Sequence, residues 1–342
     1  MPKFTTMARC NTKDCHGATS PKGSPALNEY VLWKAKDPHS KTFTTLYKGP
    51  SKAMGLAMPT PIPKVAESPK CLTCHSKIVP PAQVVANAKW SLQSGVSCEV
   101  CHGPAEKWID PHVTPKEKDW PHEKSVAVGM IDLRDVTTWA VTCASCHLQI
   151  DHEMVAAGHP KLHFELVDYN DRTGAHWKTE KHPSMQPGFD ARVWTTGQAV
   201  SFAEALRNLA ARVKAGAPEP RLKEARELAA AYGRMVKLLG AATAEVPDDA
   251  AKMEELATAM DGQAKTLAAA DATFLAKLAA EEAPKDFAAA RQTALAFKAL
   301  SSKPEAKAAV DALALSVAAK NEEKVDAAKF AADYEAVRAL FK

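Results

Sequence analysis

The eight cysteines of this chain occur in four pairs, and a histidine directly follows the second cysteine of every pair. All eight lie within the first 146 of 342 residues. Every cysteine belongs to a pair, so none is left over for a disulfide. Three pairs have two intervening residues, and the first pair has four. In chain order the pairs are Cys10 and Cys15 before His16, Cys71 and Cys74 before His75, Cys98 and Cys101 before His102, and Cys143 and Cys146 before His147.

The Cys-x-x-Cys-His pattern is the attachment signature of haem c. Two thiols bond to the vinyl groups of the haem, and the adjacent histidine lies under the iron as its proximal ligand. The second, third and fourth pairs therefore predict haem at His75, His102 and His147. Two Cys-x-x-Cys pairs can also bind zinc, but zinc explains neither the four adjacent histidines nor the further ones.

The first pair is spaced differently, with Asn-Thr-Lys-Asp between Cys10 and Cys15. A disulfide or half of a metal site are alternative interpretations. A histidine, His16, directly after the second cysteine and then Gly17 favour an expanded haem-binding loop. With this loop counted, the sequence predicts four haem c groups.

Eight histidines remain as candidates for the sixth iron ligand, which in low-spin haems is usually histidine or methionine. His39, His112 and His159 each lie beside a proline. Proline restricts the backbone, so less entropy is lost when the ring is held against iron. We therefore predict these three as distal ligands. His163 is an alternative to His159; His122, His176 and His182 are reserves; His152 is expected to contact a ligand, and Met54 and Met58 to pack.

Composition divides the chain into two parts. Residues 1–200 hold every cysteine, histidine and tryptophan and 18 of the 23 prolines. The remainder is rich in alanine and has apolar residues at helical spacing. We predict a mainly α protein in which a loop-rich multihaem cytochrome c domain, residues 1–196, precedes a haem-free all-α bundle of five or six helices, residues 197–342. Ser201 and Glu204 form a potential capping box at the start of this bundle.

Charge and hydropathy exclude several classes of protein. The net charge of +4 comes with no basic stripe, so nucleic-acid binding is not expected. The sequence contains no run of eighteen apolar residues, so we expect no membrane-spanning helix. The first seven residues do not resemble a secretion signal. Because haem is attached after export, we expect a processed protein of the periplasm or the extracellular space.

Four segments resemble the tetrahaem cytochrome c-554 family, whose haem packing is shared with hydroxylamine-oxidoreductase-like proteins. The resemblance implies closely spaced haems, mostly with two histidine ligands, and allows one five-coordinate haem. It also implies that His39, His112 and His159 are distal ligands. The expanded first pair and the helical tail depart from the family pattern. The segments are 37–43, 68–75, 95–108 with His112 following, and 158–165.

Three functions are compatible with these features. Electron transfer between redox proteins is favoured, because four haems in roughly 150 residues must lie close together and two histidine ligands close the iron to substrates. An alternative is a redox enzyme acting on small nitrogen compounds at a five-coordinate haem. The third possibility is a subunit of a cytochrome filament or a larger complex, assembled through residues 197–342.

Overall fold

A computed structural model describes the chain except for residues 23–25, 114–119, 174–175, 177–187 and 319–324. The described chain is mainly helical, as the sequence predicts, with long connecting loops. Its β structure is an isolated parallel bridge between Phe4 and Val84. Two compact units are present: residues 1–139 with 170–185, and residues 140–169 with 186–342.

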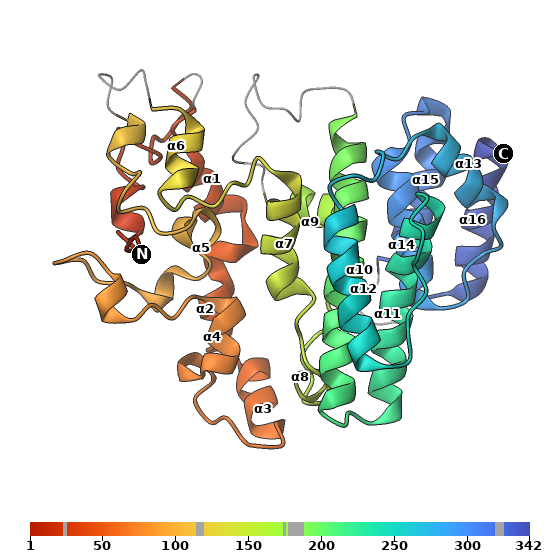
Figure 1. Ribbon diagram of the computed structural model, residues 1–342, viewed down its shortest axis with the longest axis horizontal. Coiled ribbons are helices and arrows are strands. Elements are labelled where there is room, and N and C mark those ends of the chain that lie inside the picture. The colour runs from red at the N-terminus through yellow and green to blue at the C-terminus, as the bar shows by residue number, and fades with distance from the viewer. Residues whose placement is uncertain (23–25, 114–119, 174–175, 177–187, 319–324) are drawn as a thin grey trace. The chain divides into compact units, whose positions relative to one another are not determined.

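The first unit consists of short helices between proline-containing turns (Figure 1). Its apolar clusters are small, and one of them groups Phe43, Leu46, Val65 and Leu72. Clusters of this size bury little aliphatic surface, which agrees with a part of the chain that is built around a cofactor. The helices are α1 (Glu29–Lys36), α2 (Thr42–Thr45), α3 (Gly49–Ala57), α4 (Pro69–His75), α5 (Cys98–His102) and α6 (His122–Ala127).

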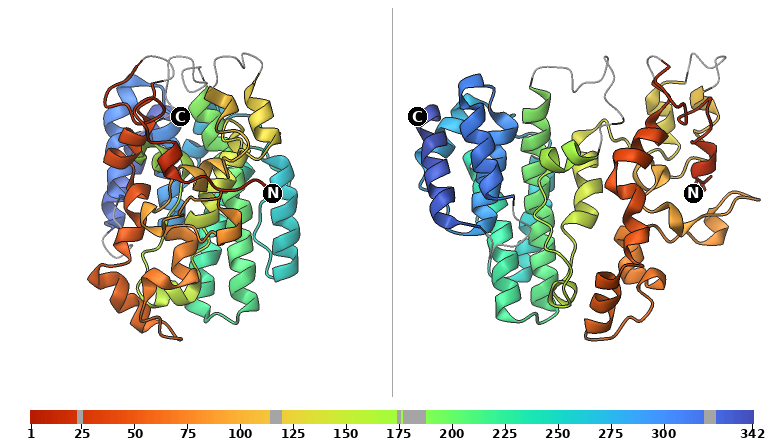
Figure 2. Two further views of the ribbon diagram at one scale, coloured as in Figure 1. Left: turned by 90° about the vertical axis from the view of Figure 1, so that its left-hand side faces the viewer. Right: turned by 180° about the vertical axis from the view of Figure 1, so that it is seen from behind.

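The second unit is a helical bundle around α10 (Phe189–Lys214), which is buried along most of its length. In the views of Figures 1 and 2, α11 (Glu219–Leu238) and α12 (Ala250–Gln263) run beside α10, and both pack against it. The other helices of the bundle are α13 (Ala272–Ala280), α14 (Phe287–Leu300), α15 (Lys307–Ser316) and α16 (Ala327–Phe341). The same unit contains α8 (His152–Ala156), while the division between the units falls within α7 (Val136–His147) and α9 (Leu166–Arg172).

Helix boundaries in the bundle differ partly from those predicted. The capping box is wrong, because Ser201 lies in the middle of α10 and is buried there. The structure has seven helices from α10 to α16 where five or six were expected. Aspartate begins several of them: Asp249, Asp271 and Asp286 each accept backbone N–H bonds at the first turn. The final amphipathic helix is confirmed as α16.

Residues 163–168 are built into the core of the bundle. Phe164 is 1 % exposed, and its carbonyl accepts hydrogen bonds from the Tyr232 hydroxyl and from Gln292 Nε2. Arg291 of α14 bonds the His163 carbonyl at 3.3 Å. The segment that follows the fourth cysteine pair is therefore part of the same packing unit as the helices. The compositional boundary at 196/197 falls within α10, and a two-domain organisation with that boundary stays a prediction.

In the residues that the structure describes, we find no helix that is both long and apolar enough to cross a bilayer.

Candidate functional site

The first cysteine pair, Cys10 and Cys15, sits in a loop that is hydrogen-bonded onto itself. The His16 amide donates to the Cys10 carbonyl at 3.0 Å, and the Gly17 amide donates to the Thr12 carbonyl at 2.9 Å. A Cβ on Gly17 would lie 2.0 Å from the carbonyl oxygen of the residue after Cys10, so this close approach requires glycine. The four intervening residues are thereby folded within the loop, and its two ends are held together.

The imidazole of His16 is oriented by a carboxylate. Its Nδ1 lies 2.8 Å from Oε2 of Glu29, the first residue of α1. The other carboxylate oxygen of Glu29 accepts the Leu27 amide at 3.2 Å. The bond to Glu29 raises the pKa of His16 above its usual value, against the opposing effect of burial. With Nδ1 engaged in this way, Nε2 is the ring nitrogen suited to a metal.

The imidazole rings of His16 and His112 lie near each other and nearly parallel. Their rings are parallel within 7° and their centroids are 6.3 Å apart. Metal–imidazole bonds of roughly 2 Å on either side of one metal would place ring centres about 6 Å apart. Nδ1 of His112 is held by the Ile109 and Trp108 carbonyls, at 2.6 and 3.1 Å. The centroid spacing is therefore close to that of two histidines bound to one metal.

The second pair, Cys71 and Cys74, lies on α4, whose last residue is His75. Both cysteines are partly buried, and burial raises the pKa of the Cys71 thiol. Nδ1 of His75 is 3.0 Å from the Thr42 carbonyl and 3.1 Å from the Thr45 hydroxyl, both on α2. Here too an oxygen orients the ring through Nδ1, but this oxygen is uncharged.

The imidazole of His39 is also held through Nδ1, in the proline-containing turn that begins at Asp37. The buried side chain of Asp37 accepts the His39 amide and also lies 2.9 Å from Nδ1 of that ring. Pro38 occupies the first position of the short turn between them. A proline turn and an aspartate thus fix this imidazole together.

The third pair, Cys98 and Cys101, lies on α5, the helix that ends at His102. Both cysteines are partly buried, and residues three apart in a helix share one face. Burial, and then the charge of the neighbouring His176, lower the pKa of His102 to about 4. The His102 ring is therefore neutral at ordinary pH, which is the form of imidazole that binds a metal.

A buried carboxylate follows the first cysteine of the third pair. Glu99 is 2 % exposed and accepts three backbone N–H groups, from Thr5 at 2.8 Å, Thr6 at 2.7 Å and Ala105 at 2.9 Å. Two of these donors lie in the N-terminal segment and one lies just beyond α5. The N-terminal segment is thus bonded directly to the loop of the third pair.

The fourth pair, Cys143 and Cys146, lies in the last part of α7, and His147 ends that helix. Both cysteines are partly buried. The ring of His147 stacks on Phe164 at 5.3 Å and meets Tyr169 edge-on at 4.8 Å. All of these residues belong to the helical unit. His147 is therefore placed by the aromatic residues that follow it in the chain.

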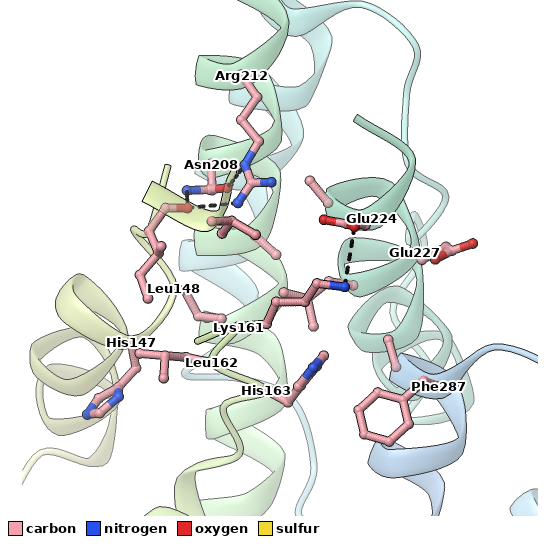
Figure 3. A pocket seen from close by; sticks show the side chains of 16 residues that line it. His147, Leu148, Lys161, Leu162, His163, Asn208, Arg212, Glu224, Glu227 and Phe287 are labelled. Atoms are coloured by element: carbon pink, nitrogen blue, oxygen red, sulfur yellow. Dashed lines mark hydrogen bonds and ion pairs between the residues drawn. The ribbon is translucent and has the colours of Figure 1, made fainter. Parts of the chain in front are cut away.

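His147 and His163 line a shared pocket of about 60 Å³ (Figure 3). Lys161 reaches across it to Glu224 at 3.3 Å, while the ring of His163 packs edge-on against Phe287 at 4.8 Å. Burial lowers the pKa of His163 to about 4. The rings of His147 and His163 point in different directions, so they are not paired as His16 and His112 are.

The remaining predicted ligands have varied surroundings. Nδ1 of His159 lies 2.9 Å from the Pro160 carbonyl. His122 uses Nε2, at 2.8 Å from Asp132. His152 begins α8, Met58 is buried, and Met54 lies within α3. His182 lies outside the described residues.

Several residues that shape the site escaped sequence reasoning. Glu29, Phe164 and Tyr169 follow no spacing rule relative to the histidines that they contact or orient. Glu99 binds backbone amides instead, and its place between Cys98 and Cys101 is visible in the sequence. The contacts of the others depend on tertiary folding.

Comparison with known proteins agrees with these observations. Residues 9–103 match the sequence model of a family described as cytochrome c554 and c-prime. The matched segment contains the first three cysteine pairs, including the expanded one. No curated protein and no solved structure matches the chain. Residues 9–103 are therefore similar to the cytochrome c554 and c-prime family, and the match supports a c-type cytochrome with covalently attached haem c.

Proposed function

We propose that the protein carries four haem c groups and transfers electrons between redox protein partners. The observation that carries this proposal is the parallel arrangement of His16 and His112 at 6.3 Å. It supports a haem at the first pair, whose loop is expanded, and it supports ligation by two histidines. An iron with both axial positions filled exchanges electrons but has no open position for a substrate.

In this proposal each cysteine pair attaches one haem through two thioether bonds. The partial burial of all eight cysteine side chains supports this role, because a thioether bond lies at the edge of an enclosed haem ring. The attachment residues are Cys10 and Cys15 for the first haem, Cys71 and Cys74 for the second, Cys98 and Cys101 for the third, and Cys143 and Cys146 for the fourth.

In this proposal histidines would supply the iron ligands, a proximal one next to each cysteine pair and a distal one from elsewhere in the chain. His16, His75, His102 and His147 are the proximal ligands, and His112 is the distal partner of His16. His39 and His159 are the next distal ligands, with His163 as the alternative to His159. The bonds that fix Nδ1 of His16, His39, His75, His112 and His159 support these roles, because they direct Nε2 to the metal.

Haem c supplies a one-electron ferric/ferrous couple when it is bound. The residues of the chain orient the imidazole rings through Nδ1 and partly bury the cysteines that would attach the haems. Each passage moves one electron from a reduced donor protein to an oxidised acceptor protein, and no bond is formed or broken.

We further propose that the protein works outside the cytoplasm, because the attachment of haem c follows export. Residues 1–196 form the tetrahaem domain in this proposal. Residues 197–342 then serve to dock the electron-transfer part to a redox partner, a larger complex or a further copy of the chain.

The test is a haem count on the purified, haem-loaded chain. Intact mass measures how many haems are covalently attached, and the ferric absorption and EPR spectra report their spin states. We expect four haems and predominantly low-spin iron. A mass with three haems or fewer overturns the count. A major high-spin component that binds nitric oxide or hydroxylamine favours the alternative, a redox enzyme of small nitrogen compounds.

A further inference from the structure

The proximal histidines differ in the charge of the group that holds Nδ1. For His75 this group is neutral, a backbone carbonyl and the Thr45 hydroxyl. For His16 it is the carboxylate of Glu29, at 2.8 Å. Of these two proximal histidines, the one in the expanded first pair is bonded to a carboxylate.

Glu29 is held in place for this contact from several directions. Its second carboxylate oxygen accepts the Leu27 amide at 3.2 Å. The adjacent Tyr30 amide donates to the His16 carbonyl at 2.9 Å, so the backbone on either side of the pair is connected. Leu27 has a φ of 57°, an unfavourable value for a non-glycine residue that the surrounding structure maintains. The side chain of Glu29 is 19 % exposed, so solvent screens the contact only in part.

A carboxylate acceptor changes the electronic properties of the imidazole. A hydrogen bond to an ionised acceptor is roughly twice as strong as one between neutral groups. A carboxylate on the outer nitrogen of a metal-bound histidine raises the basicity of that ligand. A more basic ligand stabilises the ferric state more than the ferrous state, because the ferric iron has the higher charge. The reduction potential falls as a result.

Ligation on the opposite side does not cancel this effect. His112 is held through the Ile109 and Trp108 carbonyls, which are neutral. At this ring pair the carboxylate that bonds directly to Nδ1 is therefore that of Glu29.

We propose that Glu29 acts as a tuning residue that lowers the reduction potential of the haem attached at Cys10 and Cys15. The inference rests on the proposed function, since it requires a haem at the first pair. A lowered potential makes this haem a stronger electron donor than it would be with a neutral partner. Asp37, 2.9 Å from Nδ1 of His39, applies the same chemistry at a predicted distal ligand.

The experiment is a potentiometric titration of the full-length, haem-loaded chain followed by haem absorbance. Glu29→Gln keeps the shape of the side chain and removes its charge. We expect one haem to titrate at a higher potential, with its reduction equilibrium shifted by tenfold or more, which is about 59 mV for one electron. Glu67→Gln is the control, because Glu67 pairs with Lys64 on the surface and its side chain is 70 % exposed. The control should leave every potential unchanged.

The possible failures can be told apart. A wild-type mass with no haem on the peptide containing Cys10 and Cys15 defeats the proposed function at this pair. Four attached haems with unchanged potentials in Glu29→Gln overturn the tuning role alone. If Glu29→Gln fails to load this haem, Glu29→Asp takes over the test. It keeps the charge with one methylene fewer, and we expect a smaller upward shift; an unchanged potential again overturns the inference.

Discussion

The side chains of Cys10 and Cys98 lie close enough for each to shift the pKa of the other, although the two belong to different cysteine pairs. The contact lowers the pKa of Cys98 and raises that of Cys10. The hydrogen bonds to Glu99 bring the N-terminal segment to the third pair just before this point. His16 and His112, each near one of these two pairs in the sequence, lie with their rings nearly parallel and the ring centroids 6.3 Å apart. The first and third pairs thus form one structural assembly.

This contact predicts magnetic interaction between the haems of the first and third pairs. Haems attached at two neighbouring cysteines would lie close enough for their ferric irons to interact magnetically. We expect the low-spin EPR signal of the first haem to be broadened in the fully ferric protein. The double variant with Cys98→Ala and Cys101→Ala, which lacks the third haem, should restore a normal signal. The prediction fails if the remaining signals of this variant are the same as in the wild type, with three haems confirmed by mass.

Replacing His112 should open one iron without detaching its haem. Proximal ligation by His16 and the two thioether bonds remain in His112→Ala, so the haem count stays unchanged. One haem then becomes high-spin, which is measured by ferric absorption and EPR. His122→Ala is the matched control, because its Nε2 is bonded to Asp132 at 2.8 Å. A loss of low-spin iron in the control but not in His112→Ala would reverse the assignment.

Glu99 should matter for the stability of the N-terminal segment. Oε1 of Glu99 accepts the Thr5 and Ala105 amides and Oε2 accepts the Thr6 amide. Glu99→Gln replaces one of these oxygens by an NH2 group that cannot accept, so at least one buried amide loses its acceptor. An unsatisfied buried group costs about 2 kcal/mol, which corresponds to roughly thirtyfold faster exchange of these amides. Hydrogen exchange with peptide-level mass measurement reads this out. Glu106→Gln, which loses an exposed bond from the backbone amide of residue 3, should change exchange by much less.

How much of this structure was readable from the sequence depends on the range of the interaction concerned. The four attachment pairs, the proline turns at His39 and His112, and the amphipathic pattern of α16 are local features, and their structures could be anticipated. The pairing of His16 with His112 is a tertiary contact between distant segments, and the sequence left open which distal histidine serves which haem. The predicted capping box at Ser201 is wrong although its residues match the local pattern, because α10 continues through Ser201 and buries it in the bundle. Aspartates such as Asp271 do begin helices of the bundle, and the preference of aspartate for this position is a local property of the sequence.

The fourth pair illustrates the same limit. Composition places His147 with the loop-rich part of the chain, because cysteine, histidine and proline all occur there. Packing places it with the helices, because Phe164 is bonded by Tyr232 and Gln292 of the bundle. Composition reports which residue types are present, whereas the packing unit depends on the contacts that they make.

The pH dependence of bundle stability should include a contribution from Glu224. Partial burial disfavours its ionised form, but the bond from Arg221 and then the charge of Lys161 outweigh this and lower its pKa below the ordinary 4.5. A depressed carboxyl pKa stabilises the fold above pH 4.5, and the gain is lost as the pH falls through the folded-state value. Glu224→Gln should therefore reduce stability by about 0.5–1 kcal/mol at pH 7 and by progressively less below pH 4.5. Helical circular dichroism in denaturant at several pH values measures this difference, and a constant difference across the range would contradict the prediction.

Two glycines of the bundle should respond to alanine in opposite directions. In α11, a Cβ on Gly233 would lie 2.4 Å from the Ala244 carbonyl oxygen and 3.1 Å from the ring of Phe202, so neighbouring backbone would have to move. Overpacking of this kind costs about 1–3 kcal/mol. In α12, a Cβ on Gly262 would have no neighbour within 4 Å, and alanine there should stabilise the helix by about 0.5 kcal/mol.

Thermal unfolding of the two variants, followed by helical circular dichroism with the haem count held equal, tests this pair of glycine predictions. Because Gly233→Ala and Gly262→Ala make the same chemical change in helices that both pack against α10, their difference isolates the close approach at Gly233. Equal unfolding midpoints for the two variants would mean that α11 does not pack tightly against the backbone at Ala244. A lower midpoint for Gly233→Ala, with unchanged haem potentials, would establish that bundle packing is set independently of the redox centres.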